Sequence, residues 1–134
     1  MPTVDSVSSF AGNGVGPFTW AHTCSGADRL LRVTVSHFDS SDAVTDITYN
    51  GVALTAVPSG ATTNGQYWIT AYYLIAPDVG TYNIVVTVAG NVFDLGAGAI
   101  SYNDVHQTVP LGTAVTATGT GTTPTVDVSS AADE

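Results

Sequence analysis

Three carboxylates lie close together in the segment 39–46, at Asp39, Asp42 and Asp46, and we call this segment the acidic loop. Oxygen-rich loops of this kind are where proteins bind calcium. The spacing does not match an EF-hand loop, however, and the segment has no glutamate to bind the ion with two oxygens. We therefore expect a solvated loop without a metal, with a weak calcium site as the alternative.

The three histidines, His22, His37 and His106, are far apart and form no HxH or HExxH pattern. His22 and His37 lie on neighbouring strand-like segments and could meet as a metal-binding pair, although ordinary strand histidines are the simpler interpretation. The serines include no G-x-S-x-G elbow that would expose a nucleophile. Cys24 is the only cysteine, so it forms no internal disulfide, and we expect it to pack as a small apolar residue. These patterns predict a protein that is not an enzyme, with no catalytic residue and no cofactor.

The densest aromatic group comprises Tyr67, Trp68, Tyr72 and Tyr73. Aromatic rings can stack on sugars, which makes Tyr67, Trp68 and Tyr72 candidate ligand-facing residues. The interleaved Ile69, Leu74 and Ile75 favour the simpler interpretation, in which these rings pack in the protein interior.

The charge balance excludes several classes of partner. The chain of 134 residues carries two arginines, no lysine and a net charge of -9. Nucleic acids and anionic membranes both require basic side chains, so neither is an expected partner. No apolar run reaches the length of about 20 residues that a membrane helix needs. The first ten residues have neither a basic nor an apolar region of a secretory signal, which favours synthesis in a cytoplasm.

The composition predicts one all-β domain over residues 1–134, an antiparallel sandwich or jelly-roll-like fold of about nine short strands. Val, Thr, Ile and Tyr are abundant, and Gly and Pro separate the apolar segments. Alternation predicts that Leu31, Val33 and Val35 share one core with Ile84, Val86 and Val88. The expected strands are 3–10, 18–23, 29–38, 44–49, 52–57, 66–75, 82–88 and 95–102, with 66–75 central in its sheet.

Two further segments carry local predictions. Asn50-Gly51 between two strand-like segments predicts a two-residue hairpin turn with positive φ at both positions. Residues 112–134, which we call the tail, are rich in Thr, Gly and Ala. We expect them to form either an exposed strand or a segment that binds a partner, because they have little apolar mass to anchor them in a core.

Several sequence segments occur together in a characteristic order. They are Phe18-Thr19-Trp20-Ala21-His22-Thr23, Arg29-Leu30-Leu31-Arg32-Val33, Ile47 to Thr55 around Tyr49-Asn50-Gly51, Tyr72 to Pro77, Gly80 to Val86, Gly98 to Tyr102, and Asp104 to Pro110. In this order the chain resembles the N-terminal two-thirds of a β-sandwich module of tailed-phage structural proteins and large bacterial surface proteins. That module continues with further strands beyond the equivalent of residues 125–130. The resemblance implies a sandwich fold and no catalytic residues. It leaves three alternatives for the further strands: the chain is a shortened variant of the module, a partner supplies them, or the natural protein is longer.

These observations together predict a non-enzymatic structural protein of a virus particle, such as a capsid decoration or tail-associated subunit. Its expected partners are copies of itself, a capsid protein or a tail protein, and its expected location is the virion. The alternatives are an extracellular or cell-surface adhesin or carbohydrate-binding module, and a filament subunit joined by strand exchange.

Overall fold

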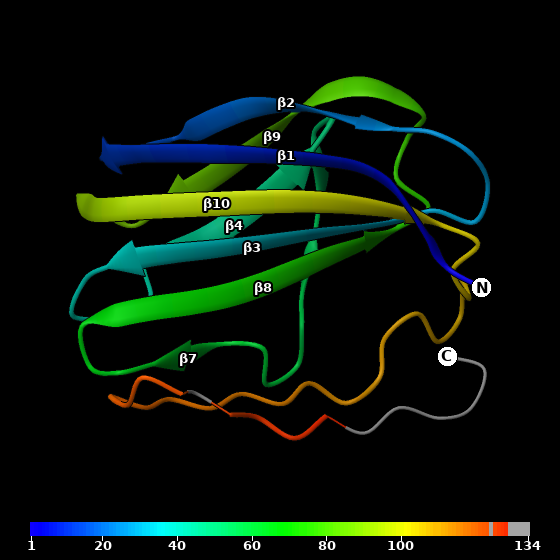
Figure 1. The fold of residues 1–134 in the computed structure, drawn as a ribbon. Coiled ribbons are helices and arrows are strands. Elements are labelled where there is room, and N and C mark those ends of the chain that lie inside the picture. The colour runs from blue at the N-terminus through cyan, green and yellow to red at the C-terminus, as the bar shows by residue number, and fades with distance from the viewer. Residues whose placement is uncertain (124, 129–134) are drawn as a thin grey trace.

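The computed structural model describes residues 1–123 and 125–128, and its strands form two antiparallel sheets that pack face to face (Figure 1). The predicted all-β sandwich is confirmed, with ten strands, three of which span two residues each. Sheet A has the order β1-β10-β3-β8-β6, and β7 also pairs with β8. Sheet B has the order β2-β9-β4-β5. The strands are β1 (Thr3–Gly14), β2 (Phe18–Cys24), β3 (Leu30–Phe38), β4 (Val44–Tyr49), β5 (Val52–Ala53), β6 (Thr55–Ala56), β7 (Thr62–Thr63), β8 (Tyr67–Ile75), β9 (Gly80–Val88) and β10 (Val92–Asn103).

The core lies between the two sheets and follows the alternation of the sequence. Successive side chains of a strand point to opposite faces, so every second residue of β3 and β9 can enter the core. The predicted core is confirmed: residues from both sheets belong to one buried cluster. Its members from these two strands are Leu31, Val33 and Val35 of β3 and Ile84, Val86 and Val88 of β9.

The hairpin prediction is also confirmed. Asn50 and Gly51 have φ of 49° and 76°, and Tyr49 pairs with Val52 across the turn. Positive φ at both central residues matches the twist of the flanking strands, which is why Asn-Gly is favoured here.

The segment after this turn differs from the prediction of one strand over 52–57. Val52 and Ala53 pair with β4 in sheet B, whereas Thr55 and Ala56 pair with β8 in sheet A. Leu54, which is buried, lies between the two pairs and marks the point where the chain crosses from one sheet to the other.

The prediction that residues 66–75 form a central strand is only partly correct. β8 pairs along its whole length with β3, but on its other side it contacts only the two-residue strands β6 and β7. Tyr67 and Ile69 are each 45% exposed, so the second apolar face of β8 is not covered as a central strand would be.

Two strands, β1 and β10, are longer than predicted. β1 continues through the glycine-rich stretch to Gly14, and β10 begins at Val92. These two long strands pair with each other, and β1 forms one edge of sheet A.

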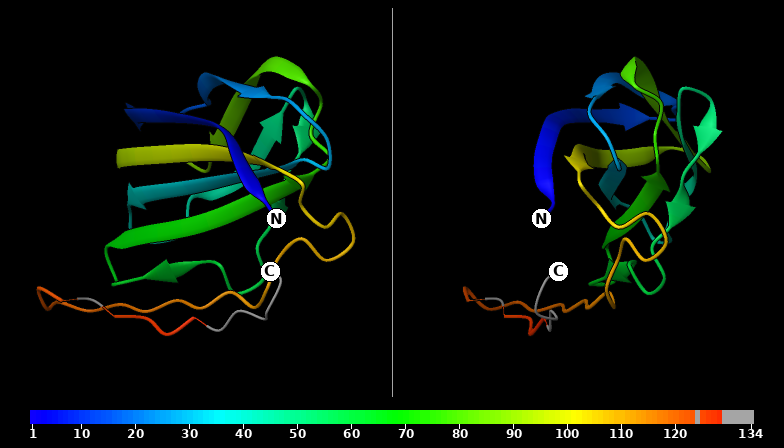
Figure 2. Two further views of the ribbon diagram at one scale, coloured as in Figure 1. Left: turned by 45° about the vertical axis from the view of Figure 1, so that its right-hand side comes forward. Right: turned by 90° about the vertical axis from the view of Figure 1, so that its right-hand side faces the viewer.

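The described part of the tail contains no strand and runs beneath β7 in an extended course that turns back on itself (Figure 2). In the described part of the chain, no helix is long and apolar enough to cross a membrane.

Candidate functional site

The three aspartates of the acidic loop do not converge on one point. The Asp39 carboxylate accepts a hydrogen bond from the Ser40 backbone N–H at its own turn. Asp42 Oδ1 accepts the backbone N–H of Val44 at 3.2 Å and lies 3.2 Å from His37 Nε2. In residues 1–123 and 125–128, no group of three or more His, Cys, Asp or Glu side chains has an arrangement that could hold a metal ion.

The three histidines have separate surroundings. His22 Nδ1 is 2.8 Å from Ser8 Oγ, and that hydroxyl oxygen also accepts the Trp20 indole N–H at 3.0 Å. His37 is fully buried near the C-terminal end of β3, where it contacts Asp42 and the backbone N–H of Ala43. His106 follows β10 and accepts hydrogen bonds within its own turn. His22 and His37 therefore bond to different partners.

A polar network between the edges of the two sheets was not predicted from the sequence. Asp5 accepts hydrogen bonds from the backbone N–H of Ser25 and from the hydroxyl of Ser101, each at 2.8 Å. Tyr49 is fully buried and donates its hydroxyl proton toward the carbonyl of Gly80 at 2.9 Å. The bonds of Asp5 join β1 to β10 and to the turn that follows β2, whereas the bond of Tyr49 joins β4 to the start of β9 within sheet B.

The surroundings of this network shift the pKa values of its groups. Burial raises the pKa of Asp5, but the hydrogen bonds from Ser25 and Ser101 outweigh it and hold this pKa below its usual value. Burial lowers the pKa of His22, and the nearby charge of Asp5 opposes that effect only in part. Burial also raises the pKa of the Cys24 thiol, which makes the thiolate scarce. Cys24 is fully buried within the core cluster, in agreement with the expected packing role.

The candidate ligand-facing aromatics lie on opposite faces of β8. Trp68 is opposite the fully buried His37 and faces the interior, and Tyr72 packs against the core. Burial and the nearby charges of Asp42 and Asp46 raise the pKa of Tyr72. Tyr67 faces outward, where its ring meets Phe38 with centroids 5.2 Å apart. The structure therefore does not gather the three rings into one ligand-binding surface.

A further candidate surface is the outward face of sheet A, which we call the outer face. Small residues occupy its centre in one cross-strand row, where Gly98 of β10, Thr34 of β3 and Ala71 of β8 are neighbours. Larger apolar residues flank this row, among them Ile69 and, at one end, Phe93, which is 52% exposed. A sheet face that only water covers usually carries polar side chains. Exposed apolar patches like this one often mark sites of contact with another molecule.

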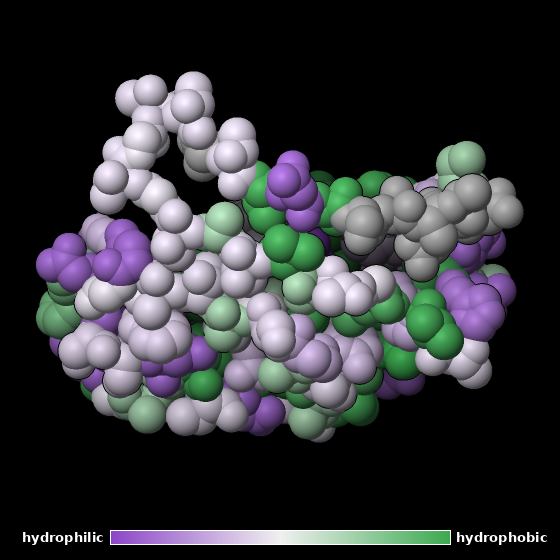
Figure 3. Space-filling view, turned by 90° about the horizontal axis from the view of Figure 1, so that it is seen from below, coloured by the Kyte–Doolittle hydropathy of each residue, from purple (hydrophilic) through white to green (hydrophobic). Residues whose placement is uncertain are grey.

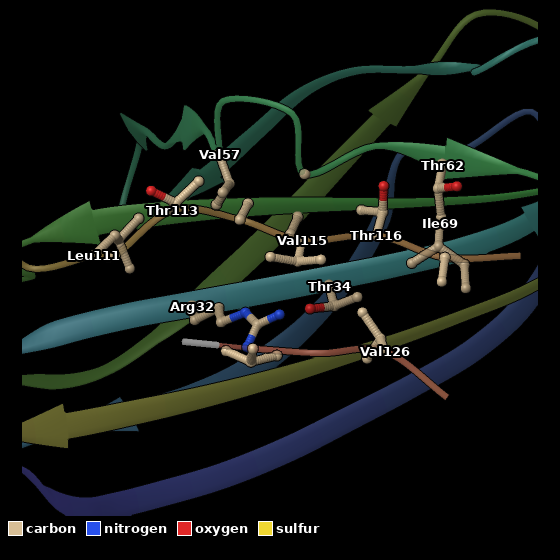
Figure 4. Close-up of a pocket in the computed structure, with 16 residues that line it drawn as sticks. Arg32, Thr34, Val57, Thr62, Ile69, Leu111, Thr113, Val115, Thr116 and Val126 are labelled. Atoms are coloured by element: carbon tan, nitrogen blue, oxygen red, sulfur yellow. The ribbon is translucent and has the colours of Figure 1, made fainter. Parts of the chain in front are cut away.

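The tail borders a groove on this face. The groove has a volume of about 600 Å³, with Arg32, Thr34 and Ile69 among its residues on sheet A. Leu111 to Ala117 form its opposite wall together with Val126 and Val128 (Figure 4). Seen from below, this side of the molecule is mostly weakly polar, with apolar groups between the polar ones (Figure 3). Tail and outer face thus form one continuous candidate interaction surface.

Comparison of the chain with protein-family models, curated proteins and solved structures gives no match.

Proposed function

We propose that this protein is a non-enzymatic structural subunit of a virus particle, such as a capsid decoration or tail-associated protein, which works by associating with other protein chains. The observation that supports association is the outer face of sheet A with the tail beside it. Apolar side chains remain exposed on this face, and the tail packs against it without forming a strand in its described residues. Surfaces of this kind become stable when a second protein covers them.

The distribution of charge supports protein partners in particular. Two long stretches of the chain are uncharged: the sequence holds no charged residue from Ser6 to Ala27 or from Gln107 to Val126. The acids are concentrated in loops, such as the acidic loop. Like copies can therefore meet through β1 or the tail with little local repulsion, although the net charge of -9 opposes approach over a longer range. The virus-particle setting follows from the resemblance to the phage-type module.

A second candidate function, carbohydrate binding at a cell surface, is favoured by one observation. Phe93, Phe38 and Tyr67 are consecutive cross-strand neighbours at one end of the outer face, and two of them are about half exposed. A row of exposed rings is a suitable platform for stacking sugars. Trp68 and Tyr72 are not part of this row, because they face the interior.

Two measurements on the full-length protein separate these functions. Sedimentation velocity over a wide range of protein concentration should show association that strengthens as salt rises, because salt screens the net negative charge. Immunogold labelling of virus particles from the source culture should then place the protein on the particle. A protein that stays monomeric and labels no particle would contradict the proposed function. Glycan binding that is lost in Tyr67→Ala but kept in Tyr82→Ala would support the second candidate.

A further inference from the structure

One edge of sheet A is open. β1 is the end strand of this sheet, on the side opposite the tail (Figure 1), and it pairs with β10 alone. Among the described residues, no backbone hydrogen bond joins β1 to β2. β1 spans 12 residues and none of them is buried, so water reaches both of its faces. The N–H and C=O groups that point away from β10 are therefore a template for a further strand.

The middle of β1 lacks the features that usually keep an edge strand from pairing. Natural edge strands carry charged side chains, proline or a bulge. The sequence has neither a charged residue nor a proline in the range 6–14. The register with β10 is irregular only near each end of the strand, outside the range 6–12. This range is therefore a regular, uncharged edge with Ser9 at its centre.

A second copy of the chain offers a strand that fits this edge. Of the strands that end the two sheets, only β1 and β2 span more than two residues. On β1, Val4 and Val7 are 63% and 67% exposed. The outward residues of β2 are Thr19, Ala21 and Thr23, none of which is large and apolar. Pairing β1 with β1 closes both open edges at once, because a two-fold contact uses the same surface on each copy, whereas pairing β1 with β2 would continue from copy to copy.

The charge of β1 selects the direction of pairing. Asp5 is the only charged residue of this strand. A parallel pair in register would place the two Asp5 residues side by side at the interface. In an antiparallel pair centred on Ser9 they lie about eight residues apart along the strands, which is about 27 Å. This distance exceeds the Debye length of about 8 Å at physiological salt, so the antiparallel pair avoids the repulsion.

We propose that two copies of this chain pair through β1, antiparallel and about a two-fold axis at Ser9, so that their sheets A form one continuous sheet. This inference deepens the proposed function and rests on it, since it names the surface through which copies associate. In the pair, Ser9 lies opposite Ser9 of the second copy, and Val7 lies opposite Ala11 of the second copy. The two outer faces then lie on the same side of the joined sheet, where a third protein can cover both.

Charge at the two-fold axis tests the pairing in the full-length chain. Ser9 is exposed, so Ser9→Lys and Ser9→Asp should keep the fold. Each variant alone should weaken self-association about fivefold in sedimentation velocity, because like charges directly opposite each other destabilise a strand pair. An equimolar mixture of the two should recover association, since a heterodimer joins opposite charges. Thr19→Lys and Thr19→Asp make the same charge changes at an exposed position of β2 and should leave association unchanged.

Disulfide formation tests the register. Cys24 is fully buried, so an introduced surface cysteine is the accessible thiol. Directly opposite residues of an antiparallel pair have Cα atoms about 4.5–5.5 Å apart, within the range that a disulfide spans. Ser9→Cys should therefore form a covalent dimer under mild oxidation. Val7→Cys and Ala11→Cys should cross-link rapidly only when they are mixed, because each variant alone holds its two thiols about 13 Å apart.

The outcomes separate this inference from the proposed function. If the wild type associates and the Ser9 charge variants associate equally well, pairing through β1 is overturned and association through another surface stands. Equal weakening by the Thr19 variants would also overturn it, because the effect would then follow net charge or the edge of β2. Val7→Cys that cross-links as fast alone as in the mixture would contradict the antiparallel register. A wild-type protein that is monomeric at every concentration would contradict both proposals.

Discussion

Removal of the Tyr49 hydroxyl is a direct test of the polar network inside the sandwich. The Tyr49 side chain is fully buried, and its hydroxyl has one proton to share among three carbonyl oxygens. The carbonyl of Gly80, at 2.9 Å, is the nearest, and those of His22 and Asp78 are 3.4 Å away. Tyr49→Phe keeps the ring and its edge-on contact with Tyr82, whose centroid is 5.7 Å away, and removes only the donor.

The expected cost follows from the group that loses its partner. A buried acceptor without a donor costs about 1–3 kcal/mol, so Tyr49→Phe should lower the free energy of unfolding by that amount. For a domain of this size the melting temperature should fall by about 3–10 °C. Urea unfolding followed by tryptophan fluorescence measures the change, and the slope with urea should stay constant if both states keep their compactness.

Tyr82→Phe is the matched control. It removes the same atom from a ring that is 36% exposed, where water can replace the lost contact, so the free energy of unfolding should change by less than about 0.5 kcal/mol. Equal losses in the two variants, or no loss in Tyr49→Phe, would refute the view that the Tyr49 hydroxyl stabilises the fold.

Four further perturbations test the fold and its loops. Val86→Ala should cost about 1–3 kcal/mol in unfolding experiments because Val86 is fully buried, whereas Thr87→Ala on the exposed face should cost much less; similar costs would argue against a one-sided strand. Gly51→Val should cost about 1–3 kcal/mol through its positive φ alone, since a Cβ there meets no atom within 4 Å; unchanged stability would contradict the turn conformation. Because the pKa of His22 is lowered in the folded protein, the unfolded state binds the proton first as the pH falls. The free energy of unfolding should therefore decrease below about pH 6.5, by at most about 1.4 kcal/mol per pH unit for this group. His22→Asn should flatten that pH dependence. Chelator should leave the melting temperature unchanged, and a decrease that calcium reverses would identify the acidic loop as a calcium site.

The parts of the fold that the sequence predicts are those with a regular period or a demanding backbone conformation. β3 alternates from Leu31 to Phe38 and β9 from Ile84 to Val88, so their core-facing residues are evident without a structure. Asn50-Gly51 is predictable because few residue pairs adopt positive φ twice in succession. The crossing at Leu54 has no such signal, because two-residue strands on either side are too short to show a period.

The candidate site was less predictable because its contacts are distant in the sequence. The side chain of Ser101 meets that of Asp5 only because β1 lies beside β10, and no local pattern reports that pairing. One signal was available. In β2 the residues Phe18, Trp20, His22 and Cys24 alternate inward, so a histidine in this series must find a polar partner in the interior. The outer-face groove depends on the course of the tail, which a Thr- and Gly-rich sequence does not specify.

The pairing of β1 with β10 has a consequence for how the protein is made. Thr3 pairs with Asn103 and Gly14 with Val92, so β1 pairs with a strand that is synthesised many residues later. Translation adds about 5–20 residues per second, and β1 therefore waits several seconds for its neighbour. During that time its unpaired backbone edge is open to other nascent chains. Sheet A can close only after β10 has been synthesised, so we expect the growing chain to depend on chaperones during this interval.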